Sequence, residues 1–208
     1  MSVGFFGKVP SHGDFLCRRL PTSFTEPWDQ WLQQAMMHSQ TALEEQWLPH
    51  YLVAPIWRFA LGRGVLGPDN WAGILVPSVD KVGRYFPLTL AAPTALPAQW
   101  PDVCGLGAWF DGLEGWALHA LSEDFDLAGF DQALLALPPW APPAVHVPPG
   151  WPLMLSLVQT HPMESVNQVL FDRHSLWWTM GSADVAAVMQ GYVGLPPPEA
   201  FAGMMAGG

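Results

Sequence analysis

The stretch WAGILVPSVDKVGRYFPLT, residues 71–89, places a charged connection between two apolar segments. Residues 71–77 and 86–92 are short, apolar and bounded by Gly, Pro or Asn, a composition typical of strands. Further strands of the same kind are expected on both sides of this stretch. Their ranges are 3–7, 55–61, 153–158, 175–180 and 185–193.

A helical pattern follows the first of these strands. Apolar residues recur at positions i, i+3, i+4 and i+7, which predicts one helix over residues 24–48 that Pro49 ends. Ser23 and Glu26 resemble a capping box at its start. The side chains expected to point into the core are those of Trp28, Trp31, Leu32, Met36, Leu43 and Trp47.

Shorter helices are expected elsewhere in the chain. Their ranges are 14–20, 102–122, 126–137 and 196–205. Asp126 is a candidate N-cap, and the proline-rich run at 137–152 is expected to be a loop. Because strands and helices mix along the sequence, we predict an α/β fold, with residues 1–208 forming a single domain.

Charge is scarce and unevenly distributed. Only 12% of the 208 residues are charged, and the net charge of −10 argues against nucleic acid and anionic membrane surfaces as partners. Residues 1–90 hold seven basic and seven acidic residues, whereas 91–208 hold Arg173 against eleven acids. The cations gather in 8–19 and 58–84, either by chance or because an interaction surface lies there.

The sequence also predicts where in the cell the protein is found. No apolar run reaches about 18 residues without interruption, so we expect no membrane-spanning helix. The N-terminus lacks a basic region leading into a long apolar stretch, so no signal peptide is expected. Cys17 and Cys104 are far apart and form no disulfide framework, which favours a reducing, cytoplasmic location.

The stretch GFFGKVPSHGDF, residues 4–15, raises two catalytic interpretations. A phosphate-binding loop needs a hydroxyl residue after its Gly-Lys pair, but here Val9 and Pro10 follow, and Pro10 lacks an amide donor. His12 and Asp14 are possible metal ligands, although two ligands do not make a site. No GxSxG nucleophile motif is present, so we predict neither a metal, a cofactor nor a catalytic centre.

The charged residues of these two stretches invite a different prediction. A solvated hairpin turn is the simplest interpretation of residues 77–89, but its arginine lies beside aromatic residues, a combination typical of binding hot spots. We expect Asp14, Arg18, Asp80 and Arg84 to come close in the fold and to share ion pairs. Buried, such a network would be a structural clasp; exposed, it would be a contact surface.

Three motifs together resemble a known family. They are GFFGKVPSHGDFLCRRLP (4–21) with WDQWLQ (28–33), WAGILVPSVDKVGRYFPLT (71–89) and SLWWTMG (175–181). In this composition and order they resemble the type VI secretion-associated TagF family. The resemblance implies a layered helix–sheet–helix sandwich around a mixed sheet, in a cytoplasmic bacterial protein that is not an enzyme.

The resemblance also implies a function. Family members repress type VI secretion after translation, by opposing the threonine-phosphorylation pathway that activates it, and a forkhead-associated scaffold protein is the expected partner. Another secretion component could take its place. The 4–15 stretch would then be an edge-proximal strand and turn of a protein-binding surface. The candidate contact residues are Lys8, His12, Asp14, Arg18, Arg19, Asp80, Lys81, Arg84, Tyr85, Trp177 and Trp178.

Two alternatives remain open from the sequence alone. One is a metal-dependent hydrolase with phosphatase-like activity and a concealed site near His12, Asp14 and Asp80. The other is a structural accessory protein of the secretion baseplate.

Overall fold

The computed structural model describes residues 2–94, 107–138 and 172–207. The expected strand at 153–158 lies outside the described residues, as does most of the expected loop at 137–152. None of the described helices is long and apolar enough to cross a lipid bilayer.

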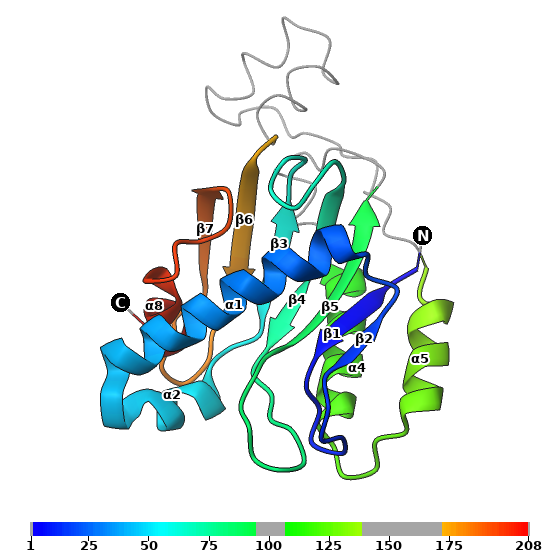
Figure 1. Ribbon diagram of the computed structural model, residues 1–208, viewed down its shortest axis with the longest axis horizontal. Helices are drawn as coiled ribbons and strands as arrows, with labels where there is room; N and C mark the ends of the chain where they lie inside the picture. Colours follow the sequence, from blue (N-terminus) through cyan, green and yellow to red (C-terminus); the bar gives the residue numbers. More distant parts are fainter. Residues whose placement is uncertain (1, 95–106, 139–171, 208) are drawn as a thin grey trace, which may run out of the picture.

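The described strands form one seven-stranded sheet in the order β2-β1-β5-β4-β3-β6-β7 (Figure 1). Their bounds are Gly4–Gly7 (β1), Leu16–Arg18 (β2), Trp57–Leu61 (β3), Asn70–Val76 (β4), Leu88–Thr94 (β5), His174–Thr179 (β6) and Val188–Val193 (β7). Every pairing is antiparallel, so the expectation of a mixed sheet is wrong for the described strands. The strands that the sequence predicts within the described residues all form.

The segment expected to be a helix over 14–20 is instead the short strand β2. It pairs with β1, with Phe5 opposite Arg18 and Gly7 opposite Leu16. The residues between β1 and β2 therefore form the connection of an antiparallel hairpin. Pairing with a neighbouring strand outweighs local helix propensity in a segment this short.

Three helices cover one face of the sheet. They are α1 (Thr22–Leu43), α2 (Trp47–Val53) and α8 (Ala200–Ala206), and Figure 1 shows α1 crossing this face diagonally. The inward stripe forms an aromatic core, because Trp28 stacks between Phe24 and Trp177 with ring centroids 5.2 and 5.9 Å away. Of the residues expected to point inward, Leu43 is half-buried and the others are buried.

The long helix is shorter than expected. It ends at Leu43 because Glu44 has a φ of 46°, outside the helical region, and a 3₁₀ turn, Glu44–Gln46, leads into α2. Pro49 lies in the first turn of α2, where a proline needs no amide donor, so it does not end a helix. The N-cap is Pro21 and makes no side-chain cap, so the expected capping box is absent.

Two helices cover the other face, α4 (Gly107–Ala120) and α5 (Leu127–Ala136). Asp126 caps α5 as predicted, accepting hydrogen bonds from the amides of Ala128 and Gly129 at 3.1 and 2.8 Å. Arg58 of β3 joins α4 to the sheet, since its guanidinium donates to Asp111 and Glu114 at 2.6 Å each.

Candidate partner-binding surface

The connection between β4 and β5 is organised around one buried carboxylate. Asp80 accepts hydrogen bonds from the amides of Val82 and Arg84 at 3.0 and 2.9 Å, from Lys8 Nζ at 2.9 Å and from Arg84 Nε at 2.6 Å. Burial by itself would raise the pKa of the Asp80 carboxyl, but these donors outweigh it and hold the pKa well below its usual range. The Asp80 side chain is therefore ionised, and both of its oxygens accept hydrogen bonds from within the fold.

The same contacts join this connection to the β1–β2 hairpin. Lys8 comes from the hairpin, and its backbone carbonyl accepts a hydrogen bond from Ser78 Oγ at 2.7 Å. The amide of Lys81 donates to the carbonyl of His12 at 3.0 Å, and the Arg84 guanidinium donates to the carbonyl of Gly13. We call residues 8–15 and 78–86, which these bonds hold together, the loop clasp.

Aromatic contacts also join the two segments of the loop clasp to each other and to β1. Phe15 lies against Phe86 with ring centroids 4.8 Å apart and stacks on Phe6 at 5.7 Å. The Lys8 ammonium lies 5.1 Å from the centre of the Phe15 ring. Because Phe15 is held by these contacts and still 47% exposed, it presents a fixed apolar face to solvent.

The loop clasp is also fixed to α2. Tyr51 is buried, and its hydroxyl donates to the Ser78 carbonyl at 2.8 Å and accepts from the Ser78 amide at 3.0 Å. Tyr85 packs edge-on against Trp47 and Tyr51, with centroids 5.9 and 5.6 Å away. Two loops and a helix therefore form one rigid end of the molecule.

The outer side of the loop clasp is mixed in character. Val82 is 69% exposed, and Lys81 and Arg84 are exposed cations. Lys81 takes part in no ion pair among the described residues, whereas Asp80 neutralises Arg84. The surface thus combines exposed apolar side chains with one positive charge outside any ion pair of the described residues, which makes it a candidate surface for protein binding.

The expected charge network forms only in part. Asp80 and Arg84 pair as predicted, but Arg18 donates to Asp131 of α5 at 3.0 Å, and Arg19 bonds the same carboxylate. Asp14 is exposed and joins no ion pair within the described ranges. The prediction of a single cluster is therefore wrong, since the arginines of β2 face α5 and not the loop clasp.

The candidate contact residues differ in accessibility. Trp177 and Trp178 are buried in the cores on opposite faces of the sheet, and Lys8 and Asp80 are buried in the loop clasp, so these four are corrected to structural residues. The other seven keep some exposure. Asp14, Arg18, Lys81 and Arg84 are exposed, and His12, Arg19 and Tyr85 are half-buried.

Comparison with known proteins bears on what this surface is for. The sequence profile described as the TagF N-terminal domain, type VI secretion system-associated, matches residues 4–137. The chain belongs to the TagF family. A crystal structure of PA0076 from Pseudomonas aeruginosa PAO1 is similar, with a TM-score of 0.84 and 37% sequence identity over 100% of this chain and 95% of that one. No curated protein sequence matches.

Both halves of the loop clasp lie inside the TagF match, and so do α1, α4 and α5. The residues that complete the surface were missed by sequence reasoning. Phe15 and Val82 gave no signal of their own, because an apolar residue type by itself favours burial, yet they are 47% and 69% exposed. Asp131, the partner of the two arginines, gave no signal because it lies 113 residues from Arg18.

The loop clasp does not offer a metal site. Among residues 2–94, 107–138 and 172–207, no group of three or more His, Cys, Asp or Glu side chains is arranged to hold an ion. His12 Nδ1 lies 2.8 Å from Ser11 Oγ, and both Asp80 oxygens already accept hydrogen bonds. A metal at Asp80 would have to displace Lys8 and Arg84 from their carboxylate partner.

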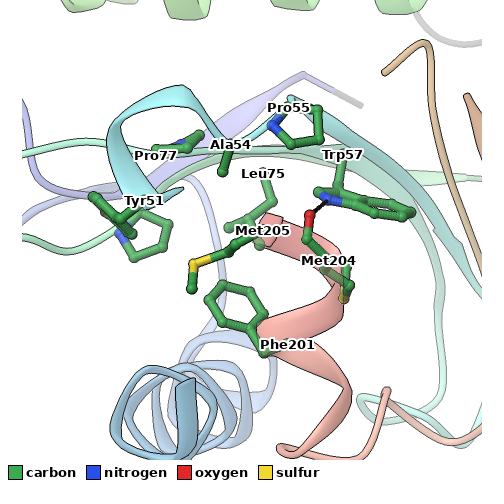
Figure 2. A pocket seen from close by; sticks show the side chains of 10 residues that line it. Tyr51, Ala54, Pro55, Trp57, Leu75, Pro77, Phe201, Met204 and Met205 are labelled. Atoms are coloured by element: carbon green, nitrogen blue, oxygen red, sulfur yellow. Dashed lines mark hydrogen bonds between the residues drawn. The ribbon is translucent and has the colours of Figure 1, made fainter. Parts of the chain in front are cut away.

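A small cavity lies between α8 and the sheet (Figure 2). Its volume is about 20 Å³, enough for roughly one water molecule. Figure 2 shows apolar side chains around it, among them Phe201, Met204 and Leu75, and Trp57 Nε1 donates to the Met204 carbonyl at 2.9 Å. The cavity is a packing defect beneath α8 and too small for a substrate.

Proposed function

We propose that this TagF family member is a non-enzymatic, cytoplasmic repressor of type VI secretion. It binds a forkhead-associated scaffold protein, or a nearby secretion component, and so opposes activation by threonine phosphorylation. The observation that carries the proposal is the loop clasp, a rigid surface within the family-matched region that presents Phe15, Val82 and Lys81 to solvent.

Binding fits this surface better than turnover. A general base or a metal ligand needs a free lone pair, but the Asp80 carboxylate is shared between two cations and two amides. The charges of the loop clasp therefore fix its shape. A fixed shape lowers the ordering cost of association, which favours a role in recognition.

The binding energy is expected to come from the apolar contacts, with charge as a secondary contribution. Arg19 is a candidate contact residue like Lys81 and Arg84, but Asp131 of α5 neutralises its charge. Lys81 remains as the exposed cation of the loop clasp without an ion-pair partner in the described chain. Charges at the rim of an interface change association rates more than affinity.

A titration of the purified forkhead-associated scaffold with this protein tests the proposal. We expect saturable binding by the parent chain and by Met37→Asp, a change at an exposed residue of α1 that is not part of the loop clasp. Val82→Asp places an unpaired charge on the apolar surface, and we expect it to weaken binding at least 10-fold, which corresponds to about 1.4 kcal/mol.

The same proteins test the non-enzymatic claim. The phosphorylated scaffold, incubated with purified protein and divalent metal, should release no phosphate. Phosphate release that is lost in Asp80→Asn, while circular dichroism shows that variant folded like the parent, would support the hydrolase alternative instead. Binding to baseplate proteins, with none to the scaffold, would support the structural alternative.

A further inference from the structure

The two edges of the sheet are built differently. At one edge, β2 has three residues, and the neighbouring arginines are tied to Asp131 of α5. At the other edge, β7 has six residues, and its sequence VMQGYV contains no charge and no proline. Short, charged or covered edges resist pairing with another strand, and among the described residues β7 has no charge, no proline and no strand on its outer side.

β7 also presents apolar side chains outward. Its register with β6 places Met189 opposite Trp178, Gly191 opposite Leu176 and Val193 opposite His174. Successive residues of a strand alternate between faces, so Met189, Gly191 and Val193 share one face. Met189 is 47% and Val193 76% exposed, on either side of a glycine.

We propose that β7 pairs with β7 of a second copy of this chain, antiparallel about a two-fold axis at Gly191. An axis perpendicular to the sheet keeps each side chain on its own face, so Met189 lies opposite Val193 of the second copy, and the contact occurs twice. Directly opposed Cβ atoms lie about 4.5–5.5 Å apart, which lets these two exposed side chains cover each other.

The charges at the ends of β7 favour the antiparallel arrangement. Arg173 precedes β6 at the end of the sheet where His174 pairs with Val193, and it is exposed and outside any ion pair of the described residues. Asp184 lies in the turn before β7, at the opposite end, where its Oδ2 lies 3.1 Å from His50 Nδ1 and its side chain stays exposed. A two-fold axis at Gly191 turns the cationic end of each copy toward the acidic end of the other, so the ends attract.

A disulfide test has a matched control. In a background with Cys17→Ser and Cys104→Ser, we introduce Met189→Cys and Val193→Cys together. Within one strand these positions are about 13 Å apart, beyond the reach of a disulfide, so only a pair of chains can link them. We expect oxidation to give a covalent dimer of the double variant, whereas each single variant has no opposed cysteine in this register and stays uncrosslinked.

Mass and amide exchange, measured over a concentration series, decide the outcome. We expect the mass to rise from 22.8 kDa toward twice that value and the β7 amides to become protected in parallel. Val193→Lys should keep the chain monomeric, and Met37→Lys should not. A mass that stays at one chain at every concentration, or β7 amides protected equally in dilute monomer because another part of the chain covers the edge, would overturn the proposal.

Discussion

Replacing Trp31 by alanine should remove one of the main supports of α1. The side chain is 6% exposed, packs against Trp28 and Trp177 with centroids 5.0 and 5.3 Å away, and donates from Nε1 to the buried Pro196 carbonyl at 2.7 Å. Truncating a core tryptophan costs about 3–5 kcal/mol, and an unsatisfied buried carbonyl adds about 1 kcal/mol or more. We therefore expect Trp31→Ala to lower the free energy of unfolding by about 4–6 kcal/mol.

Urea denaturation followed by tryptophan fluorescence and far-ultraviolet circular dichroism measures this loss. A chain of this size should also melt about 10–20 °C lower. Trp31→Phe keeps most of the ring contact and loses the hydrogen bond, so it should cost about 1–2 kcal/mol. Met37→Ala is the control at an exposed position of the same helix. If Trp31→Ala unfolded within 1 kcal/mol of the parent, our assignment of the core would be refuted.

Three further predictions concern the hairpin, a helix cap and pH. Gly7 has a φ of 137°, and a Cβ added there would collide with the Pro87 carbonyl. In thermal melts, Gly7→Ala should therefore lower the free energy of unfolding by about 2 kcal/mol or more. Gly13→Ala is the control, because a Cβ added at Gly13 meets open space and should change the stability little. Asp126→Ala should cost about 1 kcal/mol by urea titration through loss of the α5 cap. Because the folded-state pKa of Asp80 is lowered, its ionised form stabilises the fold above the usual carboxyl pKa of about 4. The stability advantage of the parent over Asp80→Asn should therefore shrink as the pH falls below that value.

Apolar periodicity predicted most of the architecture because burial of one face selects it. The strands around residues 71–89 formed as expected, and so did the buried stripe of α1 from Trp28 to Met36, whereas Leu43 is half-buried and Trp47 belongs to α2. The errors lie where partners distant in sequence decide the outcome. Residues 16–18 pair with β1 instead of forming a helix, and the break at Glu44 comes from a backbone conformation that residue type does not reveal.

The sequence predicted which two loops form the candidate surface, but not which of their side chains are buried and which are exposed. Charge density identified the two segments that meet in the loop clasp, and it predicted the Asp80–Arg84 pair. It could not tell that Lys8 would be buried with Asp80, because burial depends on how the hairpin lies on the β4–β5 connection. Trp177 was expected at the surface but is buried, because an aromatic residue type is equally typical of a binding hot spot and of a core.

The most direct test of the central claim is repression of secretion by the Val82→Asp chain in cells that depend on this protein for repression. Circular dichroism must first show that Val82→Asp and the control Met37→Asp are folded like the parent. If the loop clasp is the repressing surface, Met37→Asp restores full repression at equal protein levels and Val82→Asp does not. Full repression by Val82→Asp would contradict the account and place the contact elsewhere on the molecule.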